Sequence, residues 1–233
     1  MLERDVLIGR VREYREKLYE ASGRWGGVKI CAVTKTMDAD TANLAYEAGI
    51  DLIGENRVQE LMEKLPALNP NYEIHLIGQL QTNKVKYLMG HADMIQSLNR
   101  DSLAQEIHRQ AVKAGLVMPV LVQVNIAREP QKGGIDEEEL LPFLRRTAEL
   151  NGLRVKGLMA IMPQADDPES VRPYFKRMRD LFERLRDQAI PGIEMTELSM
   201  GMSHDCLVAA QEGATMVRLG SALFGKRDYS TAK

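Results

Sequence analysis

The sequence predicts an α/β protein that forms a single TIM-like (β/α)8 barrel with an extra helix at its N-terminus. Eight short runs rich in apolar and β-branched residues follow one another along the chain. Most of these runs are separated by stretches of helical period that end near a glycine. With 233 residues, 44% of them hydrophobic, the chain is long enough for one barrel domain, which we expect over residues 1–233.

The elements are expected to alternate after a charged N-terminal helix at about residues 3–22, which does not have the pattern of a signal peptide. The strand runs are VKICAVT (28–34), IDLIGE (50–55), EIHLIG (73–78), ADMIQSL (92–98), PVLVQVN (119–125), VKGLMAIM (155–162), MTELSMG (195–201) and ATMVRLG (214–220). The helical stretches are clearest at TANLAYEAG (41–49), AQEIHRQAVKAG (104–115) and SHDCLVAAQEG (203–213). The alternative is an open doubly wound sheet, but no GxGxxG motif follows the first strand run.

The composition argues against several classes of partner. A formal charge of −2 provides no broad field that would attract nucleic acid or an anionic membrane surface. No apolar run approaches the roughly 20 residues that span a bilayer. Cys31 and Cys206 lie in strand-like and helix-like runs and are expected to be buried, reduced thiols, and the histidines are too scattered for a metal site. We therefore expect a cytoplasmic monomer without a bound metal.

The C-terminal ends of barrel strands surround a common mouth, so polar residues at these ends are candidates for a site. Lys35 directly follows the first run, where its amine is either solvated or held inside as a nucleophile. Other polar residues in or after the strand runs are Glu55, Asn56, His75 and Asn125. The polar segment AREPQKGGIDEEE (127–139) follows the fifth run and fits a long loop at the mouth.

Two segments after the last strand runs, SMGMSHD (199–205) and LGSALFG (219–225), place small residues where a strand gives way to a helix. Backbone N–H groups at such corners bind phosphate dianions in barrels of this kind. Taken alone, Ser203 with Asp205 also fits a helix N-cap, and Gly220 fits a turn. Because both segments occur at adjacent corners, we expect a phosphate site.

Arg218 interrupts the apolar run before the second of these corners. A buried guanidinium group needs an acceptor, because leaving it unpaired in the interior costs several kcal/mol. A structural salt bridge to Glu55 or Glu197 and a contact with a ligand are both compatible with the sequence.

Eight segments together resemble the pyridoxal phosphate homeostasis protein family, over about residues 28–225: CAVTKT, GENRVQE, HLIGQLQTNK, VNIAREPQKGG, GLMAIMP, RPYFKRMRDLF, ELSMGMSHD and VRLGSALFG. That family is similar to the N-terminal barrel of alanine racemase, the third fold type of enzymes that use pyridoxal 5′-phosphate (PLP). The resemblance implies that Lys35 forms a Schiff base with PLP. It also implies that Ser203, Gly220 and Ser221 hold the phosphate and that Arg218 faces the pyridine nitrogen.

Further positions that match the family near the pocket are Asn56, His75, Ser199, Met200 and Gly201. One position departs from the family pattern, since Gln79 stands where a proline is expected after HLIG. Gln79 lies past the strand end, so the departure puts in question the shape of that loop rather than the cofactor site.

The resemblance implies a non-catalytic carrier that takes part in intracellular PLP homeostasis, without catalytic residues and with apo PLP-dependent enzymes as candidate recipients. A lysine attacks an aldehyde only as the neutral amine, and desolvation together with a nearby cation such as Arg218 favours that form. Arginine offers only donors, so Arg218 would leave the pyridine ring a weaker electron sink than a carboxylate would. Lys132 in the loop after the fifth run could be a second amine, but a solvated lysine fits that loop better.

Two alternatives stay open at this point. The first is a single-domain amino-acid racemase, because racemases of this fold also carry such an arginine. A racemase would be expected to continue into a second domain that supplies a tyrosine base, and Tyr229 is a poor substitute for it. The second is a class I aldolase, which would use Lys35 and the phosphate corner on a sugar phosphate without any cofactor.

Overall fold

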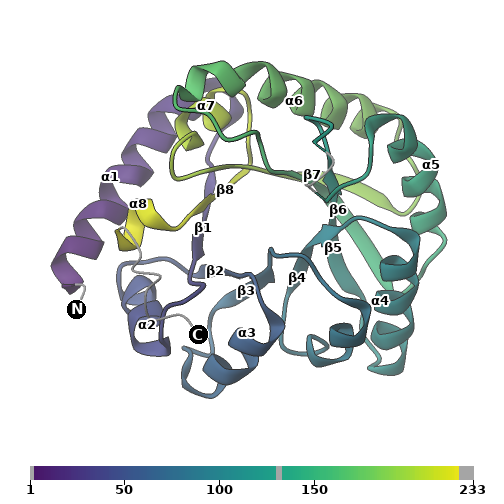
Figure 1. The fold of residues 1–233 in the computed structure, drawn as a ribbon, viewed down its shortest axis with the longest axis horizontal. Coiled ribbons are helices and arrows are strands. Elements are labelled where there is room, and N and C mark those ends of the chain that lie inside the picture. Colours follow the sequence, from purple (N-terminus) through teal and green to yellow (C-terminus); the bar gives the residue numbers. More distant parts are fainter. Residues whose placement is uncertain (1–2, 130–132, 226–233) are drawn as a thin grey trace.

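The computed structural model describes residues 3–129 and 133–225 and contains a closed barrel of parallel strands in the order β1 to β8 (Figure 1). Each strand pairs with the next along the chain, and β8 closes the ring against β1. The strands are β1 (Lys29–Val33), β2 (Leu52–Glu55), β3 (Glu73–Leu76), β4 (Met94–Leu98), β5 (Met118–Val124), β6 (Leu153–Ala160), β7 (Ile193–Met202) and β8 (Met216–Leu219). The predicted barrel fold is confirmed.

Helices surround the barrel and connect most of its strands. They are α1 (Arg4–Ser22), α2 (Ala39–Glu47), α3 (Val58–Lys64), α4 (Asp101–Lys113), α5 (Glu137–Ala148), α6 (Arg172–Asp187), α7 (Cys206–Gln211) and α8 (Ser221–Phe224). Short 3-10 segments are η1 (Gly23–Trp25), η2 (Leu65–Ala67), η3 (Thr82–Tyr87) and η4 (Pro168–Val171). Between β3 and β4 the connection contains the 3-10 segment η3 instead of an α-helix, so the alternation is less regular there than the periodicity predicts.

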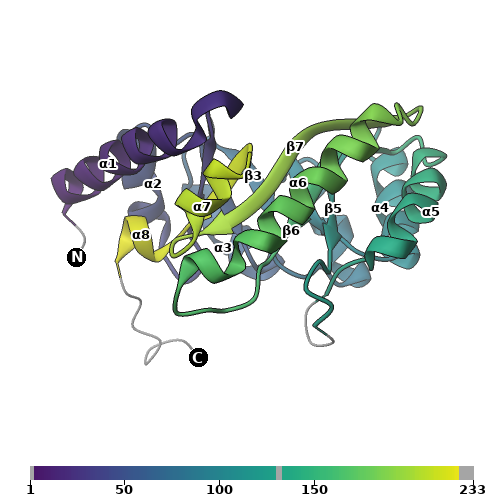
Figure 2. The same cartoon turned by 90° about the horizontal axis from the view of Figure 1, so that it is seen from above.

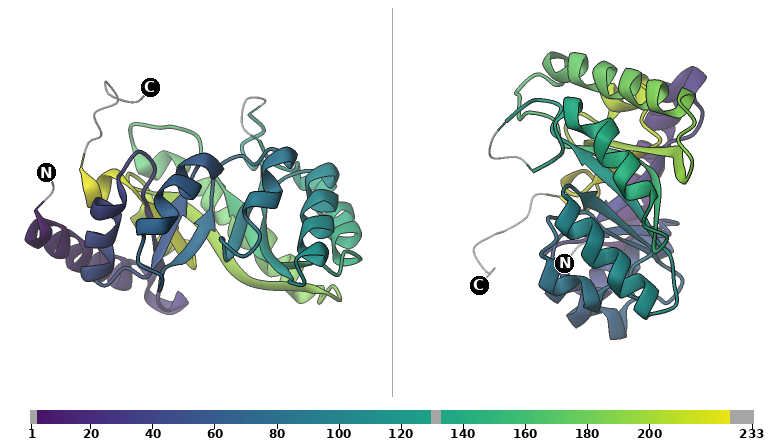
Figure 3. Two further views of the ribbon diagram at one scale, coloured as in Figure 1. Left: turned by 90° about the horizontal axis from the view of Figure 1, so that it is seen from below. Right: turned by 90° about the vertical axis from the view of Figure 1, so that its right-hand side faces the viewer.

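The outer helices bury apolar stripes whose spacing is readable in the sequence. In α1 the buried residues Leu7, Val11 and Leu18 recur at helical spacing, and the helix lies against α2, α7 and α8 (Figure 1). In α6 the buried residues Phe175 and Met178 begin a similar stripe that faces the barrel. The colours of Figure 3 (right) show α4, α5 and α6 side by side on the outside of the strands. The extra N-terminal helix predicted at about residues 3–22 is thereby confirmed.

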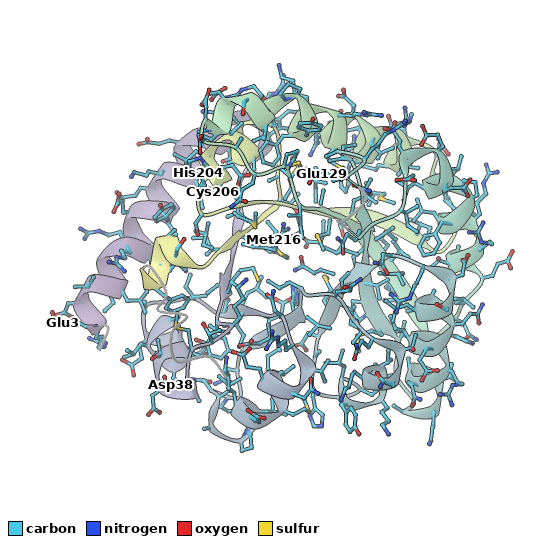
Figure 4. All side chains as sticks on the ribbon, viewed as in Figure 1. Glu3, Asp38, Glu129, His204, Cys206 and Met216 are labelled. Carbon is cyan, nitrogen blue, oxygen red and sulfur yellow. The ribbon has the colours of Figure 1, made fainter. Side chains whose placement is uncertain are left out.

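The apolar interior is divided by the wall of the barrel. A large cluster fills the layer between strands and helices and includes Ala32 and Leu219. Two small clusters are separate from it, one formed by Cys31, Leu52 and Met216 and the other by Met94, Leu121 and Met159. Because successive strand side chains point to opposite faces, these two clusters lie inside the barrel, and Met216 is seen near its centre in Figure 4.

The loops at the C-terminal ends of the strands share one face of the barrel. The loops that follow β5 and β6 extend from the same side in Figure 2 and in the left view of Figure 3. The loop that follows β3 also reaches its neighbours, because a Cβ atom on Gly78 would lie 2.1 Å from the backbone oxygen of Asn56. Gln79 lies next to this close contact, and its amide nitrogen approaches Gly133 of the loop after β5.

The loop that carries Lys35 ends at an N-capped helix. Asp38 precedes α2, and its carboxylate accepts a hydrogen bond of 2.7 Å from the backbone N–H of Thr41 (Figure 4). Hydrogen bonding to the side chain of Thr41 and to its backbone N–H holds the pKa of Asp38 below its ordinary value of 3.8. The stability that the cap contributes is therefore fully present above about pH 4 and is lost as the pH falls through the lowered pKa.

Asp38→Ala is expected to lower the free energy of unfolding by about 1 kcal/mol, because the cap of α2 is lost. Asp38→Asn is the matched control, since its amide oxygen can still accept from Thr41 and should restore most of the stability. Urea unfolding at pH 7 and again near pH 3 measures both variants. A loss that stayed the same size at the lower pH would contradict the assignment of a charged cap.

Cys31 and Cys206 are free and buried, as predicted. Burial raises the pKa of Cys31 to about 12 and that of Cys206 to about 11. Both thiols are therefore protonated at pH 8, and a thiol reagent such as dithionitrobenzoate should react with the native protein at least 100-fold more slowly than with the unfolded protein. Denatured protein should titrate for both thiols, and fast reaction of the native protein would contradict their burial.

No helix within the described ranges is long and apolar enough to cross a membrane. Among the same residues, no group of three or more histidine, cysteine, aspartate or glutamate side chains is arranged to hold a metal ion.

Candidate functional site

Lys35 lies in the turn directly after β1, at the mouth of the barrel, and is partly buried. Cys31, which lies inside the barrel, is in β1, and Lys35 follows the end of that strand by two residues. The amine of Lys35 makes no hydrogen bond or ion pair with any residue that the structure describes. A partly buried amine without a partner is available to react with a ligand.

The corner after β8 presents backbone N–H donors, and Ser203 lies against them. The hydroxyl oxygen of Ser203 accepts hydrogen bonds of 3.1 Å from the N–H groups of both Gly220 and Ala222. Register brings these corners together, because Met202 of β7 is paired with Arg218 of β8. Two donors that converge on one oxygen atom at the start of α8 form the kind of cradle that phosphate oxygens require.

Ser203 is therefore not the N-cap of α7, the structural alternative that the sequence allowed. That helix begins at Cys206 after Asp205, and the carboxylate of Asp205 accepts a hydrogen bond of 2.6 Å from the N–H of Met202. This contact closes the turn and leaves the hydroxyl of Ser203 directed toward the β8 corner. His204, which lies in this turn, and Cys206, which follows it, are marked in Figure 4.

Arg218 is buried, with 4% of its surface exposed, and has no carboxylate partner among the described residues. Its guanidinium donates to the hydroxyl of Ser199 at 2.7 Å and to the backbone oxygen of Ala160 at 2.8 Å. Burial lowers the pKa of Arg218 from its ordinary value. The suggested salt bridge is not formed, because Glu55 pairs with Lys64 and Glu197 pairs with Lys29.

A one-directional chain of hydrogen bonds runs through the barrel interior from Arg218. Since arginine can only donate, Ser199 accepts from Arg218 and must donate its own proton to the amide oxygen of Gln96 at 2.7 Å. The amide nitrogen of Gln96 then donates to Nδ1 of His75 at 2.8 Å. These directions assign the imidazole proton to Nε2, which donates to the carboxylate of Glu73 at 2.8 Å.

This chain connects the buried cation to a distant anion. The hydrogen bond from His75 holds the pKa of Glu73 below its ordinary value, so Glu73 is a carboxylate at neutral pH. Each internal member of the chain accepts one hydrogen bond and donates another, which satisfies polar groups that would be costly if left unpaired. Arg218 is thereby held in one orientation without a direct ion pair.

The other predicted site residues have different surroundings. Asn56 is partly buried and lies directly after β2, the strand paired with β1. His75 and Ser199 are fully buried members of the interior chain. Met200 packs in the outer apolar layer, so only its backbone can approach a ligand. Gly201 has a φ of +92° and no space for a side chain, because a Cβ atom there would lie 2.5 Å from the Cβ atom of Ala209.

Sequence reasoning missed several residues of this site. Gln96 could have been noticed because it interrupts an apolar strand run, just as Arg218 does. The N–H of Ala222 and the carbonyl of Ala160 carry no signal in the sequence, because any residue would supply them. The predictions for Lys132 and Tyr229 fall outside the described residues.

A cavity of about 260 Å³ lies beside the β7 corner. It is lined by residues of the loop after β6, including Ile161 and Met162, and by Met202, His204 and Asp205. The lining is mostly apolar and adjoins the turn that carries Ser203.

The residues present fit PLP. An aldehyde requires an amine that is not already paired, which Lys35 provides, and a phosphate requires convergent donors, which Gly220 and Ala222 provide. The pyridine nitrogen requires a polar partner in an otherwise apolar interior, and Arg218 is the buried donor next to the phosphate corner.

Comparison with known proteins identifies the family. The family model for the alanine racemase N-terminal domain matches residues 10–228. A pyridoxal phosphate homeostasis protein of Aquifex aeolicus is 44% identical over 95% of this chain and 97% of its own length. The pyridoxal phosphate homeostasis protein of Escherichia coli K12 is 36% identical over 94% of this chain and 95% of its own length.

Solved structures give the same result. PipY of Synechococcus elongatus, in a structure with PLP bound, superposes with a TM-score of 0.84 at 34% identity and covers 94% of this chain and 100% of its own. Alanine racemase of Corynebacterium glutamicum shares only the fold, with a TM-score of 0.74 at 18% identity over 99% of this chain and 64% of its own. The chain therefore belongs to the alanine racemase N-terminal domain family and, within it, to the pyridoxal phosphate homeostasis proteins.

Proposed function

We propose that this protein is a non-catalytic carrier that binds PLP as a Schiff base on Lys35 and serves intracellular PLP homeostasis. The observation that carries the proposal is the partly buried amine of Lys35, which has no partner among the described residues and lies at the same barrel mouth as the donor corner of Ser203 and Gly220. The names of the relatives and the PLP-bound structure of PipY support it.

In this proposal each predicted residue has a role. Ser203, Gly220 and Ser221 bind the phosphate at the β8 corner, where backbone N–H groups already converge. Arg218 donates toward the pyridine nitrogen, and Ser199 holds its guanidinium in place. Asn56 borders the pocket after β2, and Met200 and Gly201 form the part of its wall that belongs to β7. His75 supports Arg218 through the chain of hydrogen bonds that runs over Gln96 and Ser199.

The binding reaction is reversible. The neutral amine of Lys35 adds to the aldehyde carbon and one water molecule leaves, so an imine replaces the carbonyl. A second amine, on a recipient protein or in solution, can add to the same carbon and return Lys35 as the free amine. This exchange gives a carrier a route by which apo PLP-dependent enzymes receive the aldehyde without an oxidant or reductant.

The surroundings of Arg218 suit a carrier of PLP, and the racemase alternative, which also carries such an arginine, is decided by the assay for the D-isomer. PLP supplies an electron sink when its pyridine nitrogen is protonated, which a neighbouring carboxylate favours. Arg218 is a donor, and its own neighbours are a hydroxyl and a carbonyl. The nearest anion along its hydrogen bonds, Glu73, is separated from it by Ser199, Gln96 and His75.

The test is to add PLP to the purified cofactor-free protein and record absorption spectra before and after borohydride. We expect a visible band that borohydride removes, with the reduced adduct on Lys35 in a peptide map. Incubation of the loaded protein with L-alanine or L-serine should give no D-isomer above the rate with free PLP. A D-isomer formed by the protein would establish the racemase, and absence of the band would leave the cofactor-free aldolase as the better assignment.

We also propose that the carrier acts as a monomer in the cytoplasm. The large apolar side chains exposed on the described surface, such as Tyr19 of α1, Tyr87 of η3 and Val112 of α4, come from separate elements. Two buried, free cysteines suit a reducing compartment. Light scattering coupled to gel filtration should give the mass of one chain at micromolar concentration, and a stable dimer mass would contradict this part of the proposal.

A further inference from the structure

Behind the loop of Lys35 lies a buried charged cluster formed by Glu55, Glu60 and Lys64. Lys64 is the last residue of α3, and only 8% of its side chain is exposed. Its ammonium donates to the backbone oxygen of Thr34 at 2.7 Å and to one carboxylate oxygen of each glutamate at 2.8 Å. All three N–H donors of the ammonium are therefore used, and every one of them is directed at the cluster or at the loop.

The cluster contacts the residues on both sides of Lys35. Before it, the carbonyl of Thr34 accepts from Lys64, and the hydroxyl of Thr34 donates to Glu55 at 2.6 Å. After it, the backbone N–H of Thr36 donates to the carboxylate of Glu60. The chain is thus held immediately before and immediately after Lys35, while the amine of Lys35 itself has no partner in the part of the chain that the structure describes.

Thr36 needs this support. Its φ is +63°, in the left-handed region that a β-branched residue adopts only when its surroundings impose it. The hydrogen bond to Glu60 is the contact that fixes the peptide N–H of Thr36 in this conformation. The turn at Thr36 redirects the chain from β1 toward α2, so its geometry sets where the side chain of Lys35 begins.

The charges in the cluster also matter for Lys35. Glu60 reaches the peptide next to Lys35, so a carboxylate without a partner there would place a negative charge in the loop that carries Lys35. Lys64 occupies the same carboxylate, and it occupies that of Glu55 as well. Burial raises the pKa of Glu55, with the charge of Lys64 acting against it, so the carboxylate is stable there only beside that ammonium.

We propose that Glu55, Glu60 and Lys64 are positioning residues for the covalent attachment of PLP, a role that rests on the proposed function. They hold the backbone on both sides of Lys35, and Lys64 pairs with the carboxylates of Glu55 and Glu60. They bind neither the phosphate nor the ring, whose contacts lie at the β7 and β8 corners. Changes in the cluster should therefore impair the reaction of Lys35 with the aldehyde while leaving non-covalent binding intact.

Two ligands separate these effects. PLP carries the aldehyde, whereas pyridoxine 5′-phosphate has the same ring and phosphate but an alcohol in place of the aldehyde and cannot react. For Glu60→Ala we expect the rate constant for growth of the visible band with PLP to fall at least tenfold. The dissociation constant for pyridoxine 5′-phosphate, measured calorimetrically, should change less than twofold.

Further variants keep the result interpretable. Glu60→Gln retains an acceptor for the N–H of Thr36, so its rate constant should be within threefold of that of the wild type. Glu63→Gln changes an exposed neighbour on the same helix, so its rate constant should match that of the wild type. Lys64→Met removes a buried partner and is used only if thermal unfolding shows that it folds.

The inference is overturned if Glu60→Ala reacts within twofold of the wild type, if it weakens both ligands equally, or if Glu60→Gln is as slow as Glu60→Ala. Failure of the proposed function looks different, because the wild-type protein would then form no band with PLP.

Discussion

Lys35→Ala is expected to abolish the visible band that PLP gives with the wild-type protein and to leave no borohydride-stable adduct. The reason is that Lys35 is the amine proposed to form the covalent bond, whereas the N–H groups proposed for the phosphate, those of Gly220 and Ala222, lie after β8 at the start of α8 and are unaffected. Pyridoxine 5′-phosphate should bind to the variant with an affinity within about threefold of that of the wild type. Absorption spectroscopy, a peptide map and calorimetry measure the three outcomes.

The stability of the cofactor-free protein should hardly change in this variant. Lys35 makes no hydrogen bond or ion pair with a described residue, so Lys35→Ala should alter the free energy of unfolding by about 0.5 kcal/mol or less. Lys176→Ala, at an exposed lysine of α6, is the matched control and should keep the full band. A band of normal intensity in Lys35→Ala would place the covalent bond on another lysine and refute the assignment.

Ser203→Asp is expected to weaken binding of PLP by a factor of about 100 or more, because two like charges would meet in a partly buried site. Each tenfold loss of affinity corresponds to about 1.4 kcal/mol of binding free energy. The new carboxylate would take the N–H donors of Gly220 and Ala222 that Ser203 now occupies. A phosphate dianion would then meet a negative charge in place of the hydroxyl donor. Titration with PLP and with pyridoxine 5′-phosphate should show the same loss, because both carry the phosphate.

Ser203→Ala separates the charge from the loss of the hydroxyl. It removes one hydrogen-bonding group without adding charge, so its effect should be about tenfold or smaller. Both variants should fold, because the neighbouring turn is closed by Asp205 and Met202 rather than by Ser203. If Ser203→Asp bound PLP as tightly as the wild type, the phosphate site would have to lie elsewhere than at the β8 corner.

The architecture and the main candidate residues could be predicted because their signals are local. Each strand shows a short apolar run, and each outer helix shows an apolar stripe such as Phe175 and Met178 of α6. Once a barrel is assumed, strand ends converge, so Lys35, Ser203 and Gly220 could be grouped although they are far apart in the chain. The 3-10 segment η3 could not be predicted, because the periodicity does not distinguish it from a short helix.

The partners of the charged residues could not be predicted in the same way. Arg218, Glu55 and Glu197 were each recognisable as polar residues in apolar surroundings, but spacing alone did not pair them correctly. Arg218 is satisfied by Ser199 and a carbonyl, while Glu55 belongs to Lys64. Such pairs depend on side-chain reach and on the register between strands, which no local pattern records.

The amino-acid sequence by itself determined the order of strands and helices, the barrel they form and the lysine at the end of the first strand. These follow from hydrophobic periodicity and from the covalent order of residues, both of which act over a few positions. Only the tertiary structure decided which donors surround Ser203, how Arg218 is satisfied without a carboxylate, and that Lys64 occupies the glutamates next to Lys35. Hydrogen bonds and ion pairs require contact within a few ångströms, and closure of the barrel is what creates that contact between distant parts of the chain.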